Sequence, residues 1–154
     1  MIDERLLECA GQVEIEENLN RLIALVGVSV NGTAATDNLA IPTNPTADDD
    51  TMTIGTKVYT LKAVAAVDGD IAIGNANTDT QLLIRAAING TGAGQVCTAH
   101  PLVTCGEFAA NSAAITARVK GLVGNSIATT EAFTAVGNVF SAAKLAGGLD
   151  GTVI

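Results

Sequence analysis

The sequence has few of the residues on which recognition by stacking or by positive charge depends. Aromatic residues make up 3% of the 154-residue chain and tryptophan is absent, so bases and sugar rings would find few flat side chains to stack on. There are 8 Lys and Arg residues against 16 Asp and Glu residues, and the formal net charge is −8. Such a chain lacks the cationic surface that a phosphate backbone requires, which argues against nucleic acid as a partner.

Long apolar runs and secretion signals are also missing. Asp3, Glu4 and Arg5 interrupt the start of the chain, and no apolar run reaches the length needed to cross a membrane. We therefore expect neither classical secretion nor a membrane partner. The chain has three cysteines: Cys9, Cys97 and Cys105. Their odd number and wide spacing do not suit a disulfide framework and favour a reducing compartment.

The residues that are abundant predict one well-filled core. Hydrophobic residues make up 48% of the chain, mostly Ala, Val, Leu and Ile, and the length suits a single domain with an arm. Acidic residues gather in residues 3–17 and 48–50, which leaves the rest thinly charged. Such a surface indicates that partners cover part of it.

Residues 3–26 have helical composition. An apolar stripe follows the spacing of one helical face: Ile15, Leu19, Leu22 and Val26. An earlier stripe is out of phase with it, and Gly11 near the mismatch predicts a break or kink. Two positions for this helix stay open: packed on its own body, or reaching a neighbouring subunit.

Residues 31–50 have the composition of a loop, rich in Asn, Thr and Asp and containing Pro42 and Pro45. We expect a linker here. The predicted organisation is therefore an N-terminal helical arm with a Pro-containing linker over residues 1–50, and a β-rich body over residues 51–154.

The body is predicted to consist of short strands around one helix. "TMTIG" and "KVYTLKA" form a hairpin with Gly55 and Thr56 in the turn, and "DIAIG" is a further strand. Three later strand-like pieces are divided by glycine: "AAITARV", "NSIATTEA" and "NVFSAAKLAGG". The fold class is α+β and mainly β, with short antiparallel strands in a sandwich- or jelly-roll-like arrangement.

One internal helix lies between these strands. Thr78 and Gln81 have the spacing of a capping box, and Asn89-Gly90 supplies a stop. The face predicted to enter the core consists of Leu83, Ile84, Ala87 and Ile88.

The carboxylate groups do not form a recognisable cation site. Asp68 and Asp70 lack the further oxygen ligands and the late Glu of a calcium loop. The run of residues 48–50 could collect a divalent ion, but it lies where a solvated loop is expected to meet the first strand. Asp68-Gly69 is a common turn dipeptide, so turn formation is the better interpretation for that pair.

The other candidate sites are also incomplete. Cys97, His100 and Cys105 provide three local zinc ligands, and Cys9 is distant in sequence. Ser126 in "VGNSIAT" lacks the Gly-x-Ser-x-Gly elbow, and "NGTGAGQ" lacks the ending of a phosphate loop. We predict no enzyme, no cofactor and no catalytic or metal residues.

Residues 51–151 nevertheless carry an ordered series of motifs: "TMTIGTKVYTLKA", "GDIAIGNANTDTQLLIRAAINGTGAG", "AHPLVTC", "AAITARVKGLVGNSIATTEA" and "AKLAGGLDG". This series resembles a module common in tailed-bacteriophage virion proteins. The module usually has "YTF" where this chain has Tyr59-Thr60-Leu61, and "TAKTAGAAGNSIA" where residues 116–128 differ conservatively.

The resemblance implies a virion structural protein without catalytic residues. The favoured function is a capsid decoration or cement protein on the capsid surface, made in the host cytoplasm, whose partners are the major capsid protein and copies of itself as a dimer or trimer. Because the module occurs in more than one virion part, a tail or appendage subunit is the alternative. A glycan-binding module for the host surface is the alternative from another class, and the scarcity of aromatic residues counts against it.

Overall fold

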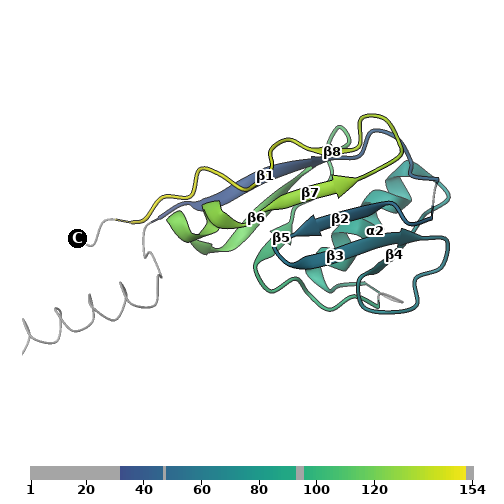
Figure 1. Ribbon diagram of the computed structural model, residues 1–154, viewed down its shortest axis with the longest axis horizontal. Helices are drawn as coiled ribbons and strands as arrows, with labels where there is room; N and C mark the ends of the chain where they lie inside the picture. Colours follow the sequence, from purple (N-terminus) through teal and green to yellow (C-terminus); the bar gives the residue numbers. More distant parts are fainter. Residues whose placement is uncertain (1–31, 47, 93–95, 152–154) are drawn as a thin grey trace, which may run out of the picture.

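The computed structural model describes residues 32–46, 48–92 and 96–151, and these form a mainly β body with two four-stranded sheets and one α-helix (Figure 1). The predicted mainly β class with one internal helix is confirmed. The N-terminal helix expected over residues 3–26 lies outside the described residues.

The first sheet has the strand order β5-β6-β1-β8. Its strands are antiparallel to their neighbours: β1 (Ala34–Ala40), β5 (Val103–Cys105), β6 (Ser112–Lys120) and β8 (Val139–Phe140). The predicted strand over residues 113–119 is confirmed as the main part of β6.

Strand β1 corrects the expected linker. Residues 34–40 pair with both β6 and β8, so the linker prediction for residues 31–50 is wrong for this stretch, and β1 belongs to the body. The polar composition was misleading because Asp37 is buried between Ala35 and Leu39 and accepts hydrogen bonds from residues distant in sequence, in β7 and directly after β8. A carboxylate satisfied in this way can occupy a buried strand position.

The second sheet has the order β4-β3-β2-β7. The predicted hairpin is confirmed as β2 (Thr51–Ile54) and β3 (Lys57–Lys62), with Gly55 at a φ of 61° in the turn. The remaining strands are β4 (Asp70–Ala72) and β7 (Thr129–Ala132). β4 is parallel to β3, so the expectation of antiparallel strands is wrong for this pair. In the connection between the two strands, the N–H groups of Ala66 and Val67 donate to the Asp70 carboxylate.

Helix α2 (Asn77–Asn89) contacts β4 and β5, which are edge strands of the two sheets. Ile84, Ala87 and Ile88 are buried as predicted, and Leu83 is partly buried against the core. The helix stops where expected, with Gly90 in the left-handed conformation at a φ of 64°.

The predicted capping pair is wrong. The N-cap is Ala76, two residues before Thr78, and its N–H donates to the Asp79 carboxylate at 3.2 Å. Gln81 instead enters the interior, where its amide Nε2 donates to the Ile41 carbonyl at 2.9 Å. Its side chain holds the helix on the segment after β1.

The two later strand-like pieces form less regular structure than predicted. Residues 125–132 begin within the short 3-10 helix η1 (Leu122–Ser126) and continue into β7. Only β8 forms within residues 138–148. The segment after it makes isolated bridges only: Ala146 pairs with Thr36 of β1, and Lys144 pairs with Ala128, the residue before β7.

One hydrophobic core lies between the two sheets and α2. The largest fully buried apolar side chains come from all three parts: Leu39, Ile41, Met52, Ile54, Tyr59, Leu61, Ile71, Ile84, Ile88, Ile115 and Leu145. A shared core of this kind fixes the sheets relative to each other.

Candidate functional site

The carboxylates of Asp68 and Asp70 close loops. Asp68 Oδ1 accepts the N–H of Thr98 at 2.8 Å and lies 3.0 Å from Lys57 Nζ. The hydrogen bond from the Thr98 backbone, followed by that from Lys57, lowers the pKa of Asp68. Asp70 Oδ2 accepts the two loop N–H groups of Ala66 and Val67, each at 3.1 Å. The two carboxylates therefore bind backbone groups of different loop segments.

The acidic run of residues 48–50 is divided in the same way. Asp48 accepts the N–H of Ala63 at 2.6 Å, and Asp49 forms an ion pair with Lys62. Asp50 is buried and accepts the N–H of Thr134 at 3.0 Å. Each of the three carboxylates thus contacts its own part of the second sheet or its loops.

His100 is a buried structural residue. Its Nδ1 accepts the N–H groups of Leu102 and Val103 at 3.1 and 3.2 Å, and its Nε2 lies 3.0 Å from the Ile54 carbonyl. Because Nδ1 accepts twice, the proton is on Nε2 and is donated to Ile54. Burial lowers the pKa of His100, so the neutral ring joins β5 to the β2–β3 turn.

The neighbouring cysteines are buried. Cys97 Sγ donates to the carbonyl of Asp70 at 3.2 Å. Burial raises the pKa of the Cys97 thiol and raises that of Cys105 to about 12, so both favour the thiol form. Cys9 lies outside the described residues. Within the described ranges, no group of three or more His, Cys, Asp or Glu residues is placed to hold a metal ion.

The remaining sequence candidates have structural contacts as well. Ser126 Oγ donates to the Val123 carbonyl at 2.8 Å within η1. In "NGTGAGQ", Gly90 ends α2, while residues 93–95 lie outside the described residues. Within the described residues of these two stretches, no nucleophile and base lie together.

Sequence analysis missed a buried polar cluster between the sheets. Asp37 accepts hydrogen bonds from the hydroxyl groups of Thr129 at 3.0 Å and Ser141 at 2.7 Å. The backbone N–H of the next residue, Asn38, donates a third hydrogen bond to the Asp37 carboxylate at 2.8 Å. These side chains are about a hundred residues apart in sequence, so no local spacing could have revealed the cluster.

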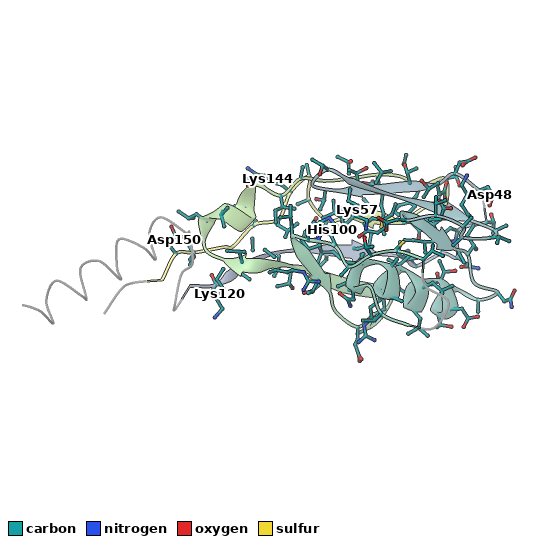
Figure 2. The ribbon with its side chains drawn as sticks, turned by 90° about the horizontal axis from the view of Figure 1, so that it is seen from below. Asp48, Lys57, His100, Lys120, Lys144 and Asp150 are labelled. Carbon is teal, nitrogen blue, oxygen red and sulfur yellow. The ribbon has the colours of Figure 1, made fainter. Side chains whose placement is uncertain are left out.

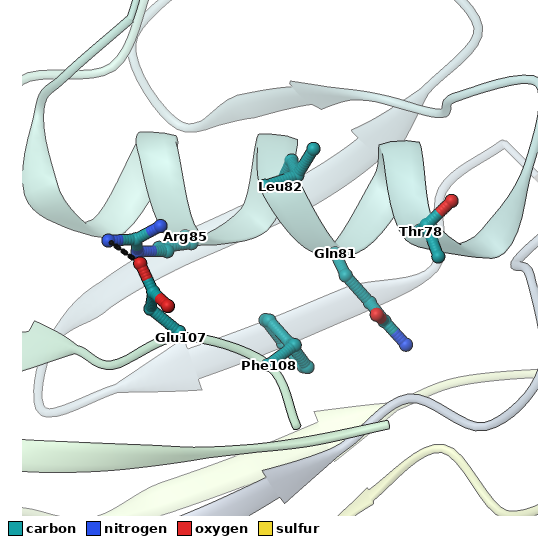
Figure 3. A pocket seen from close by; sticks show the side chains of 6 residues that line it. All are labelled: Thr78, Gln81, Leu82, Arg85, Glu107 and Phe108. Atoms are coloured by element: carbon teal, nitrogen blue, oxygen red, sulfur yellow. Dashed lines mark ion pairs between the residues drawn. The ribbon is translucent and has the colours of Figure 1, made fainter. Parts of the chain in front are cut away.

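A shallow depression of about 270 Å³ lies between α2 and the loop after β5 (Figure 3). Arg85 Nη2 and Glu107 Oε1 form an ion pair of 3.2 Å at one end, and Thr78 lies at the other. Leu82, which is mostly exposed, and Phe108 make the middle apolar. This mixture of polar and apolar side chains suits contact with a protein surface.

A second depression of about 260 Å³ lies at the end of the body that carries η1. We name it the β6–η1 groove, and its lining is largely apolar: Leu102, Ala117, Val119, Val123, Gly124, Ser126 and Ile127. Exposed apolar side chains of this kind mark a contact surface more often than a reaction site.

Comparisons with known proteins identify no relative. No family model matches the chain, and neither the curated proteins nor the solved structures include a significant match. Helices with the length and apolar character needed to span a membrane are absent from the described ranges.

Proposed function

We propose that this chain is a tailed-bacteriophage virion structural protein, a capsid decoration or cement protein that binds and stabilises the major capsid lattice. The observation that carries the proposal is the ordered motif series over residues 51–151, which resembles the virion module from its first hairpin to its last glycines. A protein that binds only the assembled lattice raises lattice stability by mass action.

The hydrogen bonds of the buried and loop polar groups support a structural role. The sequence candidates for chemistry bind backbone groups: Asp68 accepts from Thr98, His100 contacts Ile54, and Ser126 donates to Val123. The surface offers one depression of mixed polar and apolar lining, beside α2, and one that is largely apolar, the β6–η1 groove. The described residues form one body of two sheets around one core and offer no cleft between domains, which is consistent with a structural role.

The glycan-binding alternative has less support. Sugar sites usually need an exposed aromatic platform, whereas the single tyrosine, Tyr59, is fully buried and Phe140 is also buried. Phe108 and Phe133 are partly buried against the core.

Copy number in purified particles tests the function. A decoration protein should be present at a fixed ratio close to that of the major capsid protein, whereas a fibre-base or connector subunit would be present in far fewer copies. A tube or sheath subunit would be distinguished by imaging. Particles stripped of the protein should lose their genome at a lower temperature than intact particles. Adding the purified chain should restore the original temperature of genome loss. Particles unchanged by removal and addition would argue against a cement function.

Washing in salt tests the expected type of contact. Because exposed apolar residues are available on the body and carboxylates gather in few places, we expect high salt to leave the protein attached. Release at moderate salt would assign the contact to the acidic residues 14–17 and to the exposed carboxylates at the start of the run 48–50, Asp48 and Asp49.

A further inference from the structure

We propose that the β6–η1 groove is the docking site for the apolar face of residues 15–26 of the same chain. This inference is independent of the virion function. It starts from the exposure of the groove: Leu102 and Val119 are each 45% exposed and Val123 is 57% exposed. Adjacent Leu122 is 55% exposed and extends the apolar surface around η1.

The end of β6 explains why this surface is uncovered. Ala113, Ile115 and Ala117 alternate inward along the strand and are buried, and Val119 continues the same face. The pairing with β5 stops at Ala117, opposite Val103. Val119 therefore keeps a core-facing direction at a point where β5 no longer continues beside the strand.

The chain before β1 is attached beside this groove. The Thr33 carbonyl accepts the N–H of Gly121 at 2.9 Å, immediately before η1. Residues 27–32 separate Val26 from Thr33, and an extended connection of that length spans about 20 Å. Gly27 and Gly32 permit a reversal of chain direction at either end of the connection.

The sequence of residues 15–26 suits the groove. Its predicted helical face carries four branched apolar side chains: Ile15, Leu19, Leu22 and Val26. A short tether gives such a segment an effective concentration of about 1 mM beside its own groove, well above the concentration of other copies in dilute solution. This favours the segment of the same chain over that of a second copy.

Charge supports the same pairing. Residues 1–31 contain six carboxylates and two arginines. In the described part, Lys57, Lys62 and Arg85 have carboxylate partners. No ion pair is recorded there for the other three basic residues, which lie toward the groove end: Arg118, Lys120 and Lys144. Figure 2 shows Lys120 and Lys144 at this end together with Asp150, whose carboxylate accepts the N–H of Leu122.

Hydrogen exchange on the full-length chain tests the docking. We expect amide protection over residues 15–26 in the wild type and at least a tenfold loss of it in Val123→Asp, which places a charge in the groove without touching the buried core. The control is Val136→Asp, because Val136 is 90% exposed and lies in the loop joined to Thr43. That variant should keep the protection, and β2–β3 should stay protected in all three proteins.

Three results would overturn the proposal. Residues 15–26 could be unprotected in the wild type, or equally protected in Val123→Asp. Protection could also increase with protein concentration together with the measured mass, which would assign the groove to the segment of a second copy. Protection that is independent of concentration in a chain of monomer mass supports docking within one chain.

Discussion

The His100 region and the β6–η1 groove differ sharply although their residues are close in sequence. His100 is 1% exposed and both of its ring nitrogens form hydrogen bonds, whereas Leu102, two residues later, is 45% exposed in the groove. On β6, buried Ala117 is followed two residues later by exposed Val119. The residue types alone do not produce this contrast. The difference is that other parts of the body cover His100 and Ala117, whereas nothing in the described residues covers Leu102 and Val119 to the same extent.

The largest expected effect is on the free energy of unfolding when the same charge is introduced into the core and into the groove. Ile88→Asp puts an uncompensated carboxylate among fully buried side chains and should cost about 4 kcal/mol or more, enough to unfold the body. Leu83→Asp should cost less because Leu83 is only partly buried. Val123→Asp should change the stability of the body by less than about 1 kcal/mol. Urea unfolding measures all three, and equal tolerance would refute the assigned helix face.

A smaller effect is expected from removing the His100 ring. His100→Ala removes the hydrogen bonds that the ring makes with the Ile54 carbonyl and with the N–H groups of Leu102 and Val103, and it opens a cavity. We expect a loss of about 3 kcal/mol in the free energy of unfolding. Leu102→Ala serves as a control on the groove side, where a cost below about 1 kcal/mol is expected. Similar losses in the two variants would remove the contrast between the regions.

The same ring predicts a pH dependence. The pKa of His100 is lowered in the folded state, so below pH about 6.5 the unfolded chain binds a proton that the folded chain does not. Stability should therefore fall as the pH decreases from 7 to 5, with a slope approaching about 1.4 kcal/mol per pH unit. The chain has one histidine, so this part of the slope should vanish in His100→Ala. A wild type with constant stability over this range would contradict the buried neutral ring.

The smallest effects are expected at the exposed face of α2. Asp79→Ala removes the hydrogen bond to the Ala76 N–H and should cost about 0.5–1 kcal/mol. Arg85→Ala breaks an exposed ion pair with Glu107 and should cost less than about 0.5 kcal/mol. Thermal unfolding at low and high salt would measure both. Losses near those of core substitutions would show that this face is covered in the isolated protein.

The elements predicted correctly from sequence are those with strong local signals. The β2–β3 hairpin has branched residues on both sides of Gly55, and α2 has an apolar face followed by Asn89-Gly90. β1 was missed because its buried Asp37 depends on Thr129 and Ser141, which only the fold brings near. The parallel position of β4 also depends on tertiary contacts.

The positions of the candidate contact surfaces could not be predicted from the sequence. A thinly charged surface indicated that partners were needed, but it did not indicate where they bind. The β6–η1 groove combines Leu102 with residues from β6 and η1, and the depression beside α2 combines Arg85 with Glu107. Both are formed by segments that meet only after folding.

An image reconstruction of the parent particle tests the proposed function most directly. The account predicts density that fits the two-sheet body at repeated lattice positions on the outside of the capsid shell, in contact with the major capsid protein. Density for the body confined to the tail or an appendage, or particles that contain no copies of the chain, would contradict the account.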